Sequence, residues 1–341
     1  MAYSNSQDWP KYGERDQKYN GAYGVLDLIP APAGYQDLRT AYNKMKEEKK
    51  ANAPPSPADI LEEDIQVPIR DNTTVTVRVF KPNNLTPGTA PLAVITHGGG
   101  YITGDRFDEE WTSRILVRQT GAVALSVEYR LTPEHPFPTP VLDCWDVVKW
   151  AAANAATLGA DPTRGFIVGG NSAGGNIATT CGVLSIHEKL SPPITGLALQ
   201  VPLISGKEGV PEKWRHELKS YETGEKVPIM NSGGVRMFLE HYNPDLQSPI
   251  FNPWAAGVDL KGFPPVFFQL CGMDPLRDEA LIFERHLRKG LGVPTRLNMY
   301  SSLPHAFWFM QLPSLESVTK QVAKDYAGGV QWLIDQRPSQ N

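Results

Sequence analysis

The chain has 341 residues, and its apolar share of 41% and charged share of 21% are those of an ordinary globular protein with a large core. A net charge of −4 argues against a basic surface for nucleic acid or anionic lipid. No apolar run approaches the ~18 residues of a membrane helix, and the N-terminus lacks the apolar core of a signal peptide. The three cysteines lie in apolar segments, so we expect a cytoplasmic protein with reduced thiols and no integral membrane association.

Residues 1–58 form a polar segment that is helix-prone in parts and broken by prolines. It ends in a stiff boundary, Ala53-Pro54-Pro55-Ser56-Pro57. Residues 44–50 hold four lysines, with Glu47 and Glu48 among them. Mixed charges at this spacing are typical of the solvated face of a helix, and we expect one there.

Alternating apolar residues at 63–69 and 74–80, joined by a turn at Asp71-Asn72, predict two antiparallel strands at the edge of a sheet. Short continuous apolar runs follow, of the kind found in parallel strands covered on both faces. These runs are 92–95, 122–127, 166–168, 197–199, 266–270 and, more weakly, 295–300. Amphipathic segments lie between or after them at 141–156, 176–189, 279–291 and 314–336. The alternation predicts a doubly wound α/β sheet.

Residues 205–252 interrupt this alternation with a polar stretch punctuated by glycine and proline, in which only 235–242 is clearly amphipathic. An insertion of this length between core strands predicts a lid or binding element. It carries large apolar side chains that fit either packing onto the core or contact with a bulky apolar substrate: Trp214, Tyr221, Met230, Met237, Phe238 and Tyr242.

The strongest chemical signal is the segment from Gly169 to Gly175, GGNSAGG, which lies between a predicted strand and a predicted helix. A G-x-S-x-G motif in that context is typical of a nucleophilic serine on a sharp turn, with glycines at 170 and 174 for close packing. The helix N-terminus behind the turn favours developing negative charge. Taken alone, the motif also fits a glycine-rich turn with an N-capping serine. Ser172 is therefore a candidate nucleophile that needs partners.

A second glycine-rich loop, His97-Gly98-Gly99-Gly100-Tyr101, follows the strand at 92–96. Successive glycines leave backbone N–H groups unobstructed, which an oxyanion hole requires together with the amide after the nucleophile. We therefore predict an oxyanion hole built from Gly98, Gly99, Gly100 and Ala173, although a loop without a catalytic role also fits. We expect His97 to hold this loop in place.

Asp274 and His305 are the candidate acid and base. Asp274 falls at the carboxyl end of the strand at 266–270, and His305 follows the last predicted strand. Asp278 competes with Asp274, but we expect it to be an N-cap or first-turn charge of the next helix. The order Ser172, Asp274, His305 is that of α/β hydrolases. The remaining histidines fit the base less well, and none has the spacing of a metal site: His135, His187, His216, His241 and His286.

From about residue 60 onward the sequence resembles the hormone-sensitive-lipase family of esterases. The resemblance rests on five segments: HGGGY at 97–101, EYRLTPEHPFP at 128–138, GNSAGG at 170–175, DPLRDE at 274–279 and HAF at 305–307. It implies an α/β-hydrolase fold, with a mostly parallel sheet of about eight strands flanked by helices and covered by a helical cap. It also implies a triad of Ser172, Asp274 and His305 and an oxyanion hole at Gly99, Gly100 and Ala173.

The resemblance also divides the chain. Residues 59–204 and 253–341 would form the hydrolase core, and residues 1–58 and 205–252 would form the cap. Two positions depart from the family pattern: Asn171 stands where the family usually has Asp, and Ala306 follows the histidine where it usually has Gly. Neither change removes a member of the triad.

These residues predict a carboxylesterase-type serine hydrolase that acts through an acyl-enzyme on a small or medium, apolar ester, with no metal or cofactor. The same site could serve acyl transfer or hydrolysis of a lactone on a biosynthetic intermediate. A non-catalytic small-molecule receptor is a third alternative, against which the retained His305 argues. We expect a monomer or a homodimer.

Overall fold

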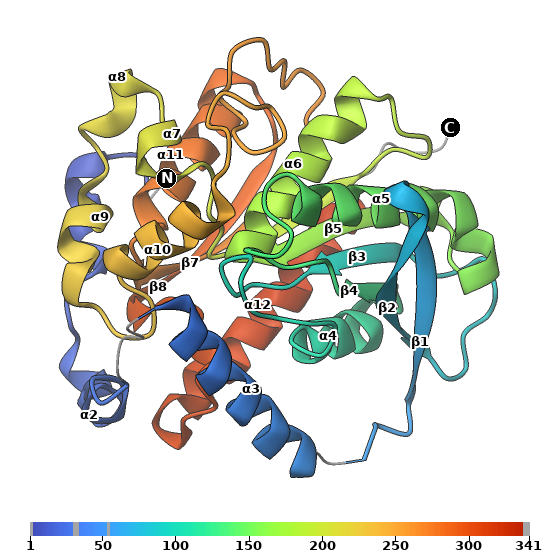
Figure 1. The fold of residues 1–341 in the computed structure, drawn as a ribbon, viewed down its shortest axis with the longest axis horizontal. Coiled ribbons are helices and arrows are strands. Elements are labelled where there is room, and N and C mark those ends of the chain that lie inside the picture. The colour runs from blue at the N-terminus through green and yellow to red at the C-terminus, as the bar shows by residue number, and fades with distance from the viewer. Residues whose placement is uncertain (1–2, 30–33, 53–54, 337–341) are drawn as a thin grey trace.

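The computed structural model describes residues 3–29, 34–52 and 55–336. A single eight-stranded sheet runs through it in the order β1-β2-β4-β3-β5-β6-β7-β8 (Figure 1). The strands are β1 (Ile60–Ile69), β2 (Thr73–Pro82), β3 (Leu92–Thr96), β4 (Val123–Val127), β5 (Phe166–Asn171), β6 (Gly196–Gln200), β7 (Val266–Met273) and β8 (Thr295–Pro304). All the predicted strands are present, and the α/β-hydrolase fold is confirmed.

The sheet is parallel except at one edge. β1 pairs antiparallel with β2, as predicted. β2 also pairs antiparallel with β4, and the six remaining strands pair in parallel. β7 and β8 are longer than predicted and reach Met273 and Pro304. These two residues are register partners, so Asp274 and His305 leave the same edge of the sheet side by side.

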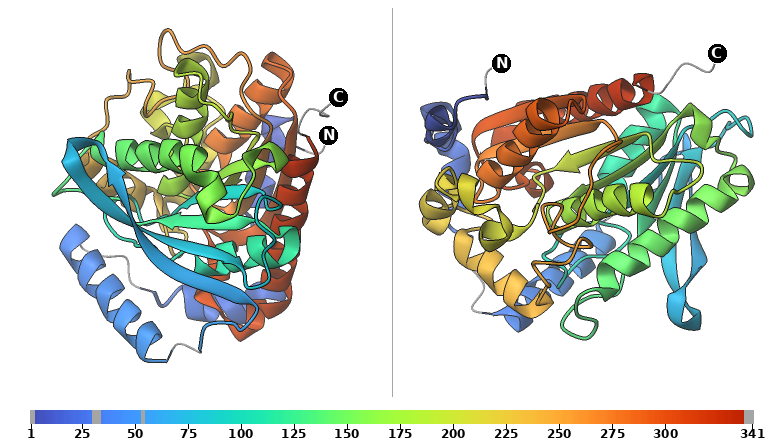
Figure 2. Two further views of the ribbon diagram at one scale, coloured as in Figure 1. Left: turned by 90° about the vertical axis from the view of Figure 1, so that its right-hand side faces the viewer. Right: turned by 90° about the horizontal axis from the view of Figure 1, so that it is seen from above.

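Both faces of the parallel strands are buried, which explains why they read as continuous apolar runs. Val94 of β3 belongs to the same hydrophobic cluster as buried residues of α5, α6 and α11, whereas its neighbours Ala93 and Ile95 belong to a second cluster with residues of α4 and α12. Figure 2 shows these helices in two layers around the sheet. Their bounds are α4 (Glu110–Thr120), α5 (Thr139–Asn154), α6 (Ala173–His187), α11 (Arg277–Arg285), continued by the π-helical turn His286–Gly290, and α12 (Glu316–Asp335).

Helix α4 was not predicted. Its buried face includes Thr112 and Ser113 beside Leu116 and Val117, so polar residues occupy half of the positions that would reveal an amphipathic stripe. The other helices of the core begin within three residues of the predicted segments. The first-turn assignment of Asp278 is also confirmed, since α11 begins at Arg277.

The predicted insertion folds into short helices and one longer helix, which Figure 1 shows beside β7, β8 and the N-terminal helices. Their bounds are α7 (Gly206–Gly209), α8 (Glu212–Arg215), α9 (Lys219–Thr223) and α10 (Ser232–Tyr242). Two buried groups tie this region to α11. Ser220 N donates to Asp278 Oδ2 at 2.6 Å, and Glu217 pairs with Arg285.

The N-terminal region contributes α1 (Trp9–Tyr12), α2 (Asn20–Leu26) and α3 (Tyr35–Ala51). Helix α3 contains the predicted lysine-rich helix, and Lys44 and Lys49 are exposed on it, as expected. Positions 53 and 54 of the predicted proline-rich boundary lie outside the described residues. Among the described residues, no helix is both long and apolar enough to cross a membrane.

Candidate active site

Ser172 occupies the one-residue turn between β5 and α6, where its backbone angles are φ 55° and ψ −116°. A non-glycine residue with positive φ is strained and persists only where its surroundings hold it. Three amides donate to the Ser172 carbonyl oxygen: Gly175 at 2.9 Å, Leu203 at 3.1 Å and Asn176 at 3.3 Å. This turn is the strained strand-to-helix elbow that the motif predicts.

The two glycines of the motif are required by close backbone approach. A Cβ on Gly170 would lie 2.2 Å from the Gly174 carbonyl oxygen, and a Cβ on Gly174 would lie 2.1 Å from the Thr96 carbonyl oxygen. Thr96 Oγ1 donates to the Gly174 carbonyl at 2.8 Å and so joins the end of β3 to the start of α6. The glycine-rich loop after β3 is thereby held against the Ser172 turn.

The loop at 98–100 turns sharply beside Ser172. Gly99, Gly100 and Tyr101 have φ values of 101°, 62° and 63°. A Cβ on Gly98 would lie 3.4 Å from Ser172 Cβ. Among the backbone hydrogen bonds between described residues, neither Gly99 nor Gly100 uses its amide as a donor. Ala173, whose amide completes the predicted oxyanion hole, is the first residue of α6.

His97 supports this loop and is not placed as a catalytic base. Its buried ring stacks on Tyr129 with a centroid distance of 4.0 Å, and Nδ1 lies 2.7 Å from the Gly98 carbonyl oxygen. Burial lowers the pKa of His97, so the ring is neutral and Nδ1–H donates to that carbonyl. Gly104 leaves the space that the ring fills, because a Cβ there would lie 2.0 Å from Nδ1.

Asp274 and His305 meet in a buried pair. His305 Nδ1 lies 2.8 Å from Asp274 Oδ2, and the residues are 6% and 3% exposed. Asp274 Oδ1 accepts from the Leu276 amide at 2.9 Å, which fixes the carboxylate. A carboxylate at Nδ1 places the imidazole proton there and leaves Nε2 as a free base. Asp274 follows β7 and His305 follows β8, so both residues lie at the carboxyl ends of the parallel strands. Ser172 follows β5 and lies at the same end of the sheet.

The two departures from the family pattern have structural consequences. Ala306 adopts φ 50°, a left-handed conformation that glycine takes without strain. Asn171 is 4% exposed and lies beneath Gly98, where a Cβ would be 2.9 Å from Asn171 Oδ1. Its Nδ2 has no hydrogen-bond partner among the described residues. A neutral amide thus occupies a buried position in which a carboxylate would bear a charge.

Glu279 supports the Ser172 turn from behind, a role that the sequence did not reveal. Its fully buried carboxylate accepts from the amides of Ile204 at 2.9 Å and Ser205 at 3.4 Å, next to the Leu203 amide that holds the Ser172 carbonyl. Burial raises the pKa of Glu279 to about 8, and the amide donors oppose that rise. In the sequence, only the position of Glu279 in the DPLRDE segment could have pointed to this role.

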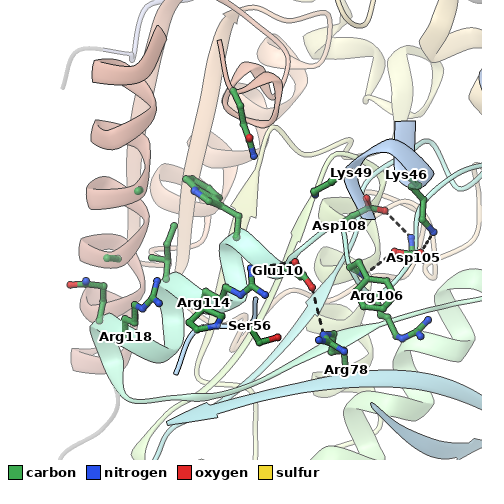
Figure 3. A pocket seen from close by; sticks show the side chains of 18 of the residues that line it. Lys46, Lys49, Ser56, Arg78, Asp105, Arg106, Asp108, Glu110, Arg114 and Arg118 are labelled. Atoms are coloured by element: carbon green, nitrogen blue, oxygen red, sulfur yellow. Dashed lines mark hydrogen bonds and ion pairs between the residues drawn. The ribbon is translucent and has the colours of Figure 1, made fainter. Parts of the chain in front are cut away.

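A groove lies elsewhere, between α3, α4 and α12 (Figure 3). Its volume is about 1650 Å³, and none of the predicted site residues lines it. Its charges are largely paired, as Figure 3 shows for Lys46 with Asp105 and for Glu110 with Arg78 and Arg114. We therefore interpret this groove as the boundary between α3 and the core of the protein.

The remaining histidines lie apart from this arrangement. His135, His187 and His216 are exposed. His241 and His286 are partly buried, and the contacts given for their rings do not involve Asp274. Within residues 3–29, 34–52 and 55–336, no group of three or more His, Cys, Asp and Glu side chains has an arrangement suited to a metal ion.

Several known proteins are similar to this chain in both sequence and fold. A family model described as alpha/beta hydrolase fold, Abhydrolase_3, matches residues 93–309. An AB hydrolase superfamily protein of Schizosaccharomyces pombe is 38% identical over 280 residues, which cover 82% of each chain. Versiconal hemiacetal acetate esterase of Dothistroma septosporum is 30% identical over 318 residues, covering 93% of this chain and 92% of that protein. The crystal structure of vibralactone cyclase superposes with a TM-score of 0.85 at 29% identity, covering 96% of this chain and 97% of the other.

The match spans more than half of the chain and includes the Ser172 turn, the glycine-rich loop and the Asp274–His305 pair. The chain therefore belongs to the α/β-hydrolase family that includes the hormone-sensitive-lipase-like esterases, and it is a hydrolytic enzyme of the carboxylesterase type.

Proposed function

We propose that the protein hydrolyses carboxylic esters in two steps through an acyl-enzyme on Ser172. The observation that carries this proposal is the buried Asp274–His305 pair. It lies at the carboxyl ends of the parallel strands, as does Ser172 in its strained turn. His305 Nε2 takes the proton of Ser172 Oγ as the oxygen attacks the ester carbonyl. The alcohol leaves with that proton, and a water activated by His305 then releases the acid.

The amides of Gly98, Gly99, Gly100 and Ala173 are proposed to supply the oxyanion hole. The turning glycine-rich loop beside Ser172 supports this role, since the Gly99 and Gly100 amides are not engaged as donors with other described backbone groups. Donors fixed before the reaction stabilise the tetrahedral intermediate without reorganisation, and each is worth about 3 kcal/mol.

We further propose that residues 1–58 and 205–252 form a cap over this site. Two contacts support the assignment. From α3, Arg39 Nε donates to the Ile102 carbonyl at 2.9 Å, just after the glycine-rich loop. From α10, the ring of Phe238 lies against Gly100. A cap of this kind would exclude bulk water and bind the apolar parts of a small or medium ester.

Covalent labelling and turnover together test the mechanism. The enzyme should hydrolyse p-nitrophenyl acetate and react with a fluorophosphonate probe, and Ser172→Ala should lose both activities. Ser301→Ala, at an exposed serine of β8, is the matched control and should retain both. Undiminished turnover by Ser172→Ala would refute the assignment. Absence of both labelling and turnover in the folded wild-type protein would favour a non-catalytic receptor.

The comparisons favour a second use of the same acyl-enzyme. One similar protein is named an esterase of versiconal hemiacetal acetate, and a similar structure is named a cyclase of vibralactone. An acyl-enzyme could pass its acyl group to an alcohol, or Ser172 could open a lactone. Product analysis with added alcohols and with lactones would distinguish these reactions, because transfer yields a new ester, ester hydrolysis yields the free acid and an alcohol, and hydrolysis of a lactone yields a hydroxy acid.

A further inference from the structure

Helix α10 presents two aromatic side chains, one turn apart, to two consecutive residues of the glycine-rich loop. The ring of Tyr242 stacks on Tyr101 at a centroid distance of 3.7 Å and an interplanar angle of 8°. One turn earlier, the Phe238 ring lies against Gly100, where a Cβ would be 2.3 Å from the ring atoms Cγ and Cδ1. Residues four apart share a face of a helix, so α10 contacts the loop along one continuous face.

The position of Phe238 is fixed because both ends of α10 are anchored. At the C-terminal end, Tyr242 is fully buried, and Thr132 Oγ1 donates to the His241 carbonyl at 2.8 Å. At the N-terminal end, Ser232 Oγ donates to the Tyr221 carbonyl at 2.6 Å. Helix α10 therefore cannot move away from the glycine-rich loop without breaking these contacts.

Phe238 also keeps part of its surface exposed, unlike Tyr242. Ser172 and His305 are only 8% and 6% exposed, so other residues cover most of their surface. An oxyanion held by the Gly100 amide would lie about 3 Å from its nitrogen. The acyl or alcohol group attached to the substrate's carbonyl carbon is then within a few bond lengths of the Phe238 ring.

We infer that Phe238 is a specificity-determining residue, which limits the size of the substrate group accepted beside the oxyanion loop. The inference rests on the proposed function and deepens it, because it names the substrate class: esters in which one side, acyl or alcohol, is short. An aromatic ring in fixed contact with Gly100 excludes longer chains by steric overlap and offers short chains an apolar wall.

Two substrate series test the inference on the whole enzyme. In the first, p-nitrophenyl acetate is compared with p-nitrophenyl octanoate, and in the second, ethyl acetate is compared with octyl acetate in a pH-stat. Phe238→Ala should raise the ratio of kcat/KM for the long substrate over the short one at least tenfold in one series. Phe238→Trp should lower the same ratio. Unchanged ratios in both series would overturn the inference.

Leu239→Ala is the matched control. Leu239 is the next residue of α10, but its Cδ1 faces Gly206, where a Cβ would lie 2.8 Å away. The variant removes similar apolar volume away from Gly100 and should leave both ratios unchanged. A merely structural role for Phe238 predicts a uniform loss for all chain lengths and would also overturn the inference.

If Phe238→Ala does not fold, Phe238→Leu should shift the ratio in the same direction by a smaller factor. Failure of the proposed function has a different signature. In that case the wild-type enzyme hydrolyses none of the four esters and is not labelled by a fluorophosphonate. Failure of the inference alone leaves the wild-type enzyme active and the Phe238 variants unchanged in selectivity.

Discussion

Asp274 Oδ2 lies 2.8 Å from His305 Nδ1, and the two residues directly follow Met273 and Pro304, which are register partners in β7 and β8. Hydrogen bonding of the parallel strands therefore brings together two side chains that are 31 positions apart in the sequence. In the proposed mechanism, the carboxylate determines which imidazole nitrogen carries the proton and stabilises the imidazolium that forms during the reaction.

Asp274→Asn should reduce kcat for p-nitrophenyl acetate by roughly 10²–10⁴-fold, because an amide can hold the imidazole in the wrong tautomer. KM should change little, since Asp274 is buried and its carboxylate is paired with His305. Steady-state kinetics measures both constants, and thermal unfolding checks that the variant folds. Asp335→Asn, at the exposed end of α12, is the control and should retain full activity. An undiminished kcat for Asp274→Asn would contradict the proposed triad.

Ser172→Gly should unfold at a higher urea concentration than Ser172→Ala. Both variants lack the nucleophile, but only glycine accepts φ 55° without strain. The expected difference in unfolding free energy is about 1 kcal/mol, reduced in part by the greater entropy of unfolded glycine. Equal midpoints with equal slopes would mean that the strain at this turn is negligible.

Gly98→Ala should lower kcat/KM by more than about tenfold, with a small loss of stability. The new Cβ would lie 2.9 Å from Asn171 Oδ1 and 3.4 Å from Ser172 Cβ, so the loop must shift relative to the nucleophile. Gly24→Ala, where a Cβ meets nothing within 4 Å, is the control and should leave kcat/KM unchanged. Full activity in Gly98→Ala would show that the loop position does not govern catalysis.

Burial of Glu109 leads us to expect a loss of stability as the pH rises. The residue is 1% exposed, its Oε2 has no hydrogen-bond partner among the described residues, and burial raises its pKa from 4.5 to about 8. Between pH 4.5 and 8 the unfolded chain ionises at this position while the folded protein keeps the proton. The free energy of unfolding therefore falls by about 1.4 kcal/mol per pH unit from this group, and the penalty is complete above pH 8.

Glu109→Gln should remove this dependence. The variant should be more stable than the wild type at pH 8.5, with an advantage that shrinks as the pH approaches 5. Urea unfolding at several pH values measures the difference. Glu240→Gln, at an exposed position of α10, should show no such trend. An advantage that does not depend on pH would mean that Glu109 is ionised in the folded protein throughout.

Local sequence patterns predicted the secondary-structure elements that have a clear hydrophobic pattern. Strands buried on both faces are continuous apolar runs, so β3 to β7 could be located from residue types alone. Helix α4 escaped detection because Thr112 and Ser113 lie on its buried face. Burial of these hydroxyls depends on the partners α4 meets, and a sequence pattern carries no information about them.

The sequence by itself determined the Ser172 turn, since a G-x-S-x-G between a strand and a helix leaves the backbone few alternatives. It also made Asp274 and His305 candidates for the acid and the base, because each follows an apolar strand. Only the tertiary structure decided that Phe238 faces Gly100 and that Glu279 holds the amides behind Ser172. These contacts join segments that are 138 and 75 residues apart in the sequence, so they depend on tertiary packing and not on any local pattern.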